Sequence, residues 1–156
     1  MAEDQHIKRG KEVILRRTLD APRELVYKVW TNPEHAGQWW GPDGFTTTTE
    51  KMEVKAGGEW IYTMHGPDGR DYPNRIKFIE VVKPERLVYI HSGDNDIVSF
   101  NVEVLFADED GKTVITMHSV FETEEILEEL NKEYHVFEGA KQHIGNLEKY
   151  LAKMQS

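Results

Sequence analysis

Residues 45–121 constrain the fold more than any other part of the chain, because they repeat a pattern of short strands and tight turns. In the clearest strand, apolar side chains occupy every second position: Val98, Phe100, Val102, Val104 and Phe106. This period of two is typical of a strand with one buried face. Similar runs cover 45–54, 59–65, 72–82, 86–91 and 113–121, with turns rich in Gly, Pro and Asp between them. Six consecutive strands joined by short turns predict an antiparallel meander.

The chain before this region predicts one strand and two short helices. Residues 13–19 alternate as a strand. Asp20-Ala21-Pro22 then ends the strand and starts a helix, because Asp caps helix N-termini and Pro is tolerated in a first turn. A second, short helix begins at Asn32-Pro33-Glu34 and ends at the breaker Gly41-Pro42-Asp43-Gly44.

The chain after this region predicts one long helix from Thr123, a suitable N-cap, to Met154. Its apolar residues recur at steps of three and four: Leu127, Leu130, Tyr134, Phe137, Ala140, Ile144, Leu147 and Leu151. At 1.5 Å per residue such a helix spans roughly 45 Å, so it is the only element long enough to cover the apolar face of the sheet. We therefore expect a single α+β domain over residues 1–156, with its core over about 11–153.

A curved sheet around one helix leaves space where the sheet bends away, and large inner side chains either fill this space or line a pocket. Trp and Tyr also carry a polar tip that can orient a ligand. The candidate ligand-binding residues are Trp39, Trp40, Trp60, Tyr62, Met64, Ile76, Phe78, Tyr89, His91, Phe100, Met117, Tyr134, Phe137 and Ile144. For the adjacent Trp39 and Trp40, core packing is favoured over a place on the pocket rim.

Composition argues against several classes of function. The formal net charge of −9 repels nucleic acids, whose binding draws on Lys and Arg, and no basic run offsets it. The chain has no cysteine, so disulfides, thiolate nucleophiles and Cys-ligated zinc are excluded. No stretch approaches the roughly 18 apolar residues of a membrane span, and the polar start does not match a signal peptide. We expect a cytoplasmic protein without a membrane span.

The sequence contains no recognisable catalytic motif, metal site or cofactor motif. Its histidines do not form the i, i+4 pair of a helical metal site, since His135 and His143 are too far apart, and HExxH is absent. GxSxG, GxGxxG and P-loop motifs are also absent. We therefore predict no catalytic residues, no metal ligands and no cofactor.

Some polar side chains are nevertheless expected to face the interior. His91 is in phase with Leu87 and Tyr89, so we expect it inside as a hydrogen-bonding group. On the strand over 45–54, one of Glu50 and Glu53 should face inward. Arg17 of the first strand is the expected partner of this carboxylate, because a buried charge without a partner is costly.

Several motifs stand in order along the chain: Arg17-x-Leu19-x-Ala21-Pro22-Arg23-Glu24-Leu25-Val26-Tyr27, Thr31-Asn32-Pro33-Glu34, Trp39-Trp40-Gly41-Pro42, Val54-Lys55-Ala56-Gly57-Gly58-Glu59-Trp60, Gly66-Pro67-Asp68-Gly69, Pro84-Glu85-Arg86-Leu87 and Gly111-Lys112-Thr113. Together they resemble the AHSA1 family (activator of Hsp90 ATPase homologue 1-like). The resemblance covers about residues 11 to 153, nearly the whole chain.

This resemblance implies the START/Bet v 1-like (SRPBCC) superfamily, whose helix-grip fold often holds lipids, polyketides or flat aromatic molecules. It agrees with the architecture expected from the strand and helix patterns. One position departs from the family pattern. Near the centre of the last helix the family usually has Gly-Trp, whereas this chain has Gly139-Ala140. The missing indole should alter or enlarge the inner volume.

These observations favour a protein that binds a hydrophobic or aromatic small molecule, lipid-, flavonoid- or polyketide-like, between the sheet and the C-terminal helix. Two alternatives stay open. The family name implies a chaperone-associated (Hsp90-type) module of the stress response. Some superfamily relatives are instead cyclase-like or hydrolase-like enzymes, and in such an enzyme His91, Tyr62 or Glu50 would be the acid–base groups.

Overall fold

The computed structural model describes residues 4–92 and 99–155, except for the side chains of Glu133 and Tyr134. In chain order its elements are β1 (Gln5–Arg9), β2 (Glu12–Leu19), α1 (Arg23–Thr31), α2 (Pro33–Trp39), β3 (Thr46–Met52), β4 (Glu59–His65), β5 (Asp71–Val82), β6 (Arg86–Ser92), β7 (Ser99–Glu109), β8 (Lys112–Val120), α3 (Glu124–Tyr134) and α4 (Val136–Gln155). All the predicted strands are present, as β2 to β8. Val98, the predicted start of β7, lies outside the described residues.

The strands form one eight-stranded antiparallel sheet in the order β1-β2-β8-β7-β6-β5-β4-β3. From β3 to β8 each strand pairs with the next, as the meander predicts. The first predicted strand, β2, pairs with the last, so that Leu15 lies opposite Met117 and Arg17 opposite Ile115. The edge strand β1 was not predicted from the sequence.

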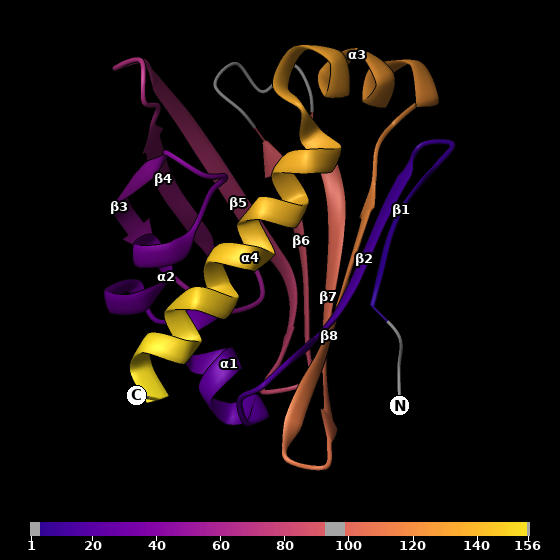
Figure 1. Ribbon diagram of the computed structural model, residues 1–156. Helices are drawn as coiled ribbons and strands as arrows, with labels where there is room; N and C mark the ends of the chain where they lie inside the picture. The colour runs from indigo at the N-terminus through magenta and orange to yellow at the C-terminus, as the bar shows by residue number, and fades with distance from the viewer. Residues whose placement is uncertain (1–3, 93–98, 156) are drawn as a thin grey trace.

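The helices cover one face of this curved sheet. Figure 1 shows α4 crossing that face diagonally, with α1 below it, α2 beside β3 and β4, and α3 lying across the upper ends of the strands. This arrangement confirms the predicted α+β helix-grip fold. No helix within residues 4–92 and 99–155 is long and apolar enough to cross a membrane.

The prediction of one continuous helix from Thr123 to Met154 was wrong, because the chain turns at His135. This residue has a φ of 54°, in the left-handed region, and it separates α3 from α4. The Asn131 side chain accepts a hydrogen bond from the Phe137 N–H at 2.9 Å, which holds the start of α4 against the end of α3. The N-cap was predicted correctly, since the Thr123 hydroxyl accepts from the Ile126 N–H at 3.1 Å.

The start of α1 also differs from expectation. Pro22, not Asp20, occupies the N-cap position, and no side chain caps this helix. The second helix begins as predicted. Asn32 caps α2 by accepting a hydrogen bond from the Glu34 N–H at 2.9 Å, and Pro33 occupies its first turn, where a missing N–H costs nothing.

The core consists of two clusters of different size. The large cluster joins the inner face of the sheet to α1, α2 and α4. The small cluster, Val13, Phe121 and Leu127, lies under α3. Phe100 packs against both clusters, so it marks the boundary between them.

Candidate ligand site

Most of the predicted ligand-binding residues form the packed core of the protein. Those that are at most 6% exposed are Trp39, Trp40, Trp60, Tyr62, Ile76, Phe78, Tyr89 and Ile144. The ring centroids of Trp40 and Trp60 lie 4.5 Å apart, and those of Trp60 and Tyr62 lie 4.3 Å apart. For Trp39 and Trp40 the favoured core-packing interpretation is therefore confirmed.

The other predicted residues are only partly covered. Met64, His91, Phe100, Met117 and Phe137 are each of intermediate exposure. The side chain of Tyr134, which was predicted with them, lies outside the described part of the structure. These large side chains of the inner face are therefore not fully covered by the helices.

We use the term seam for Phe100, Met117, Phe137 and Ala140, which lie where the two core clusters meet. Met117 and Ala140 pack against the large cluster, and Phe137 packs against the small one. Phe100 contacts both and stacks on Phe121 with ring centroids 4.4 Å apart. The seam is therefore a partly exposed apolar strip that connects the two clusters.

Polar groups next to the seam form a chain of hydrogen bonds. The Trp40 indole N–H donates to the Tyr62 hydroxyl at 3.0 Å, which lies 3.1 Å from His91 Nε2. His91 Nε2 also lies 2.9 Å from Asn74 Oδ1, while the Asn74 amide N–H donates to the Tyr72 carbonyl at 2.8 Å. Because Asn74 presents an acceptor to His91, Nε2 carries the ring proton. The Tyr62 hydroxyl hydrogen then has no acceptor among the described residues.

Burial keeps both central groups of this chain neutral. It raises the pKa of Tyr62 and lowers the pKa of His91 to about 4. A general base is most effective when its pKa lies near the working pH. At neutral pH, His91 and Tyr62 are therefore suited to hydrogen bonding with a bound group rather than to proton transfer.

A second histidine, which the sequence interpretation did not select, fixes the loop after α2. His143 of α4 is buried, and its Nδ1 accepts a hydrogen bond from the Gly41 N–H at 3.0 Å. Asn146 donates to the Gly41 carbonyl at 2.9 Å, and Gln142 accepts from the Asp43 N–H at 3.2 Å. Burial lowers the pKa of His143 to about 3, so it is a neutral acceptor.

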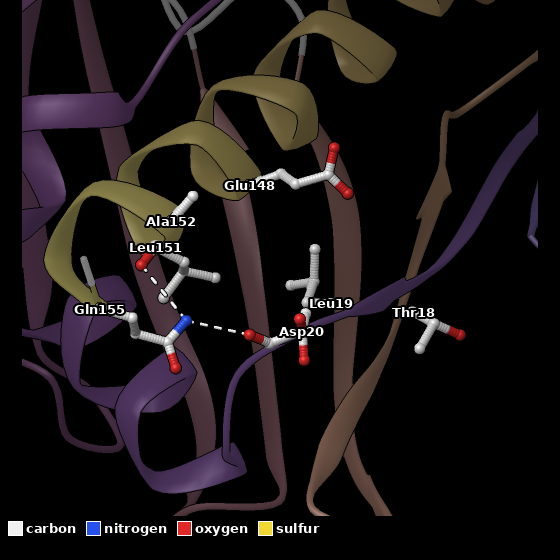
Figure 2. Close-up of a pocket in the computed structure, with 7 residues that line it drawn as sticks. All are labelled: Thr18, Leu19, Asp20, Glu148, Leu151, Ala152 and Gln155. Atoms are coloured by element: carbon white, nitrogen blue, oxygen red, sulfur yellow. Dashed lines mark hydrogen bonds between the residues drawn. The ribbon is translucent and has the colours of Figure 1, made fainter.

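Two surface recesses lie along the side of α4 that faces β2, and none of the predicted ligand-binding residues lines either. The larger, of about 390 Å³, is lined by Thr18, Leu19, Asp20, Glu148, Leu151, Ala152 and Gln155. In Figure 2, Gln155 bridges its two walls by donating to the Asp20 carbonyl at 2.9 Å. The smaller, of about 180 Å³, is lined by Arg17, Asp43, Glu138, Lys141, Gln142, Gly145, Asn146 and Lys149.

Comparison with solved structures gives many proteins of the same fold. A protein from Arthrobacter aurescens is 24% identical, with 92% of this chain and 87% of that chain covered and a TM-score of 0.86. A protein from Mycobacterium smegmatis is 21% identical, with 96% of each chain covered and a TM-score of 0.83. An AHSA1 protein from Silicibacter pomeroyi is 20% identical, with 92% and 99% covered and a TM-score of 0.75.

At these identities the structures show a shared fold and nothing about the ligand. No curated protein matches the chain. The family comparison is more specific, because the family described as activator of Hsp90 ATPase homolog 1-like protein matches residues 20–152, most of the chain. The sequence motifs, the helix-grip sheet and this match agree, and the chain belongs to the AHSA1 family.

Proposed function

We propose that this protein binds an apolar or aromatic small molecule at the seam, between the inner face of the sheet and α4. The observation that carries the proposal is the partial exposure of apolar side chains there. Phe100, Met117, Phe137 and Ala140 are all partly exposed, although each packs against a buried cluster. A concave, mainly apolar surface with a few polar groups is the usual character of a small-molecule site.

The small side chain of Ala140 supports this location. The family pattern places Trp here, whereas this chain has a methyl group that packs against the large cluster. At the neighbouring Gly139, a Cβ would meet no other atom within 4 Å, so the space around this position is open. The fully buried Trp60 and Tyr89 then act as the wall behind the ligand rather than as its first contacts.

The polar chain beside the seam gives the site one preferred orientation for its ligand. His91 lies against Phe100, with ring centroids 4.9 Å apart, so the chain that joins His91 to Tyr62 borders the seam. His91 and Asn74 are the partly exposed members of this chain, whereas Tyr62 is only 1% exposed and lies behind His91. We therefore propose a lipid-, flavonoid- or polyketide-like molecule, with an apolar body and one polar group directed towards His91.

A pair of matched substitutions on α4 tests this proposal. The neutral fluorescent probe N-phenyl-1-naphthylamine is titrated into the wild type, Ala140→Trp and Ala152→Trp. Ala140→Trp fills the seam and should weaken probe binding at least about tenfold, which corresponds to 1.4 kcal/mol. Ala152→Trp places the same indole in the larger recess and should leave binding unchanged. Loss of binding in Ala152→Trp alone would move the site to that recess and refute the seam.

A further inference from the structure

Arg17 is a cation on the inner face of the sheet. On β2 it is in phase with Leu15 and Leu19, which are at most 2% exposed and belong to the large cluster. Its neighbour across the sheet is the fully buried Ile115 of β8. Arg17 itself is half-buried, so its guanidinium lies between the sheet and α4 rather than in open solvent.

The carboxylate partner expected for Arg17 is not there. Glu50 is exposed, because a bulge between Thr49 and Lys51 shifts the register of β3 at this position. Glu53 instead pairs with Lys51 at 3.2 Å and with Lys55 at 3.9 Å. Across residues 4–92 and 99–155, no carboxylate of a described side chain lies within ion-pair distance of Arg17.

Arg17 contributes to the smaller recess, and two further cations line the same space. Lys141 and Lys149, which lie about two turns apart on α4, are exposed, and neither has an ion pair with any described residue. Asp43 and Glu138 line the recess too, so its formal charge is +1, three cations against two carboxylates, in a chain whose net charge is −9. The position midway between the lysines is Gly145, where a Cβ would lie 3.9 Å from Arg17 Nη1, so the guanidinium lies close to α4 between the two lysines.

The recess adjoins the seam. On the sheet, Leu15 lies opposite Met117 of the seam, and Arg17 follows two residues later on the same face of β2. On α4, Phe137 of the seam precedes Lys141 by one turn. The His6 ring of β1 stacks on Phe137 with centroids 3.7 Å apart, so it lies over one face of this seam residue. One elongated molecule can therefore touch both places.

We propose that Arg17, with Lys141 and Lys149, binds the oxyanion head group of a ligand whose apolar body lies at the seam. This inference rests on the proposed function and specifies its ligand as an anionic amphiphile. The planar guanidinium suits a carboxylate or phosphate because it can donate two parallel hydrogen bonds. The lysines supply additional positive charge at the solvent side of the recess.

The test uses two probes that differ only by an anionic group. 8-Anilinonaphthalene-1-sulfonate is N-phenyl-1-naphthylamine with one added sulfonate. The wild type should bind the sulfonate probe more tightly than the neutral probe. Arg17→Gln should weaken the binding of the sulfonate probe about tenfold and leave the binding of the neutral probe unchanged. Arg16→Gln, the same change on the opposite face of β2, is the matched control and should affect neither probe.

Other measurements keep the inference open to refutation. The double variant Lys141→Gln/Lys149→Gln changes only exposed side chains, so it tests the charge without disturbing the core. It should weaken the binding of the sulfonate probe about threefold. Dodecanoate and dodecyl phosphate, as competitors of the neutral probe, distinguish the two head groups, and either should displace it better than dodecanol.

The failures of the two proposals are distinguishable. If the neutral probe binds and Arg17→Gln weakens both probes equally, or weakens neither, the anion site is refuted and the seam survives. If dodecanol displaces the neutral probe as well as both anions do, the anion site is likewise refuted and the seam survives. If neither probe binds to the wild type, the proposed function fails and the anion site fails with it.

Discussion

Replacement of His143 by asparagine should change how the stability of this protein depends on pH. His143 is 8% exposed, and its pKa is about 3 in the folded protein against about 6.5 in an unfolded chain. Between these values the unfolded chain binds a proton that the folded one does not. The contribution of neutral His143 to the free energy of unfolding is thus complete above pH 6.5 and is lost as the pH falls towards 3.

The size of the effect follows from this difference of one proton. The free energy of unfolding should lose about 1.4 kcal/mol per pH unit through His143, or about 2 kcal/mol between pH 6 and 4.5. The asparagine of the His143→Asn variant cannot titrate, yet its amide oxygen occupies nearly the position of Nδ1 and can still accept from the Gly41 N–H. At neutral pH the variant should be less stable, because it loses the ring that packs 4.3 Å from Trp40.

Urea unfolding, followed by the fluorescence of the buried tryptophans, gives the free energy of unfolding of both proteins from pH 8 to pH 4.5. The gap between wild type and His143→Asn should be constant above pH 7 and should narrow by about 1.4 kcal/mol per pH unit below 6. His91, whose pKa is also lowered, is present in both proteins, and only its electrostatic coupling to His143 enters the difference. Parallel curves down to pH 4.5 would mean that His143 accepts a proton in the folded state, and the burial argument would be wrong.

Three further substitutions test the packing. Gly58→Ala should destabilise the fold by about 3 kcal/mol or more, because the added Cβ would collide with the backbone oxygen of Glu53; an unchanged urea midpoint would contradict this. Thr113→Val removes the 2.8 Å hydrogen bond to the buried Ala21 carbonyl and should cost about 1–3 kcal/mol in the same assay; no loss would show that another donor replaces it. His135→Gly should stabilise by up to about 1 kcal/mol, since glycine adopts a φ of 54° without strain; a lower melting temperature in calorimetry would show that the imidazole contributes contacts.

Alternation predicted the strands well wherever burial on one face was complete. In β7, Val102, Val104 and Phe106 are each at most 2% exposed, so burial accounts for their period of two. The edge strand β1 escaped prediction because it pairs on one side only and has little to bury. Its one aliphatic residue, Ile7, is 39% exposed. The helix break at His135 escaped because apolar spacing continues across it.

The sequence predicted which face of the sheet the site residues occupy, but not how tightly they pack there. The phase of Tyr62 and His91 on their strands placed them on the inner face, where they lie. Whether such side chains close the interior depends on volumes summed over several elements, which no local pattern contains. The role of His143 had a local signal, three residues after Ala140 and four before Leu147 on the apolar stripe of α4. The bulge that turns Glu50 outward had no such signal in the local sequence.

The pairing of β2 with β8 has a consequence for how this chain assembles. It joins Leu19 to Thr113 and Glu12 to Val120, so its formation closes a loop of about one hundred residues, whereas the hairpins from β3 to β8 close loops of a few residues. Hairpins form in microseconds, and long-range strand pairing is slower. During synthesis the N-terminal strand has no partner until residues 112–120 have emerged, and β8 keeps an unpaired edge until β2 docks. The last stage of folding therefore brings Arg17 to its place opposite Ile115, and a ligand that binds there would stabilise the closed form over the partly assembled one.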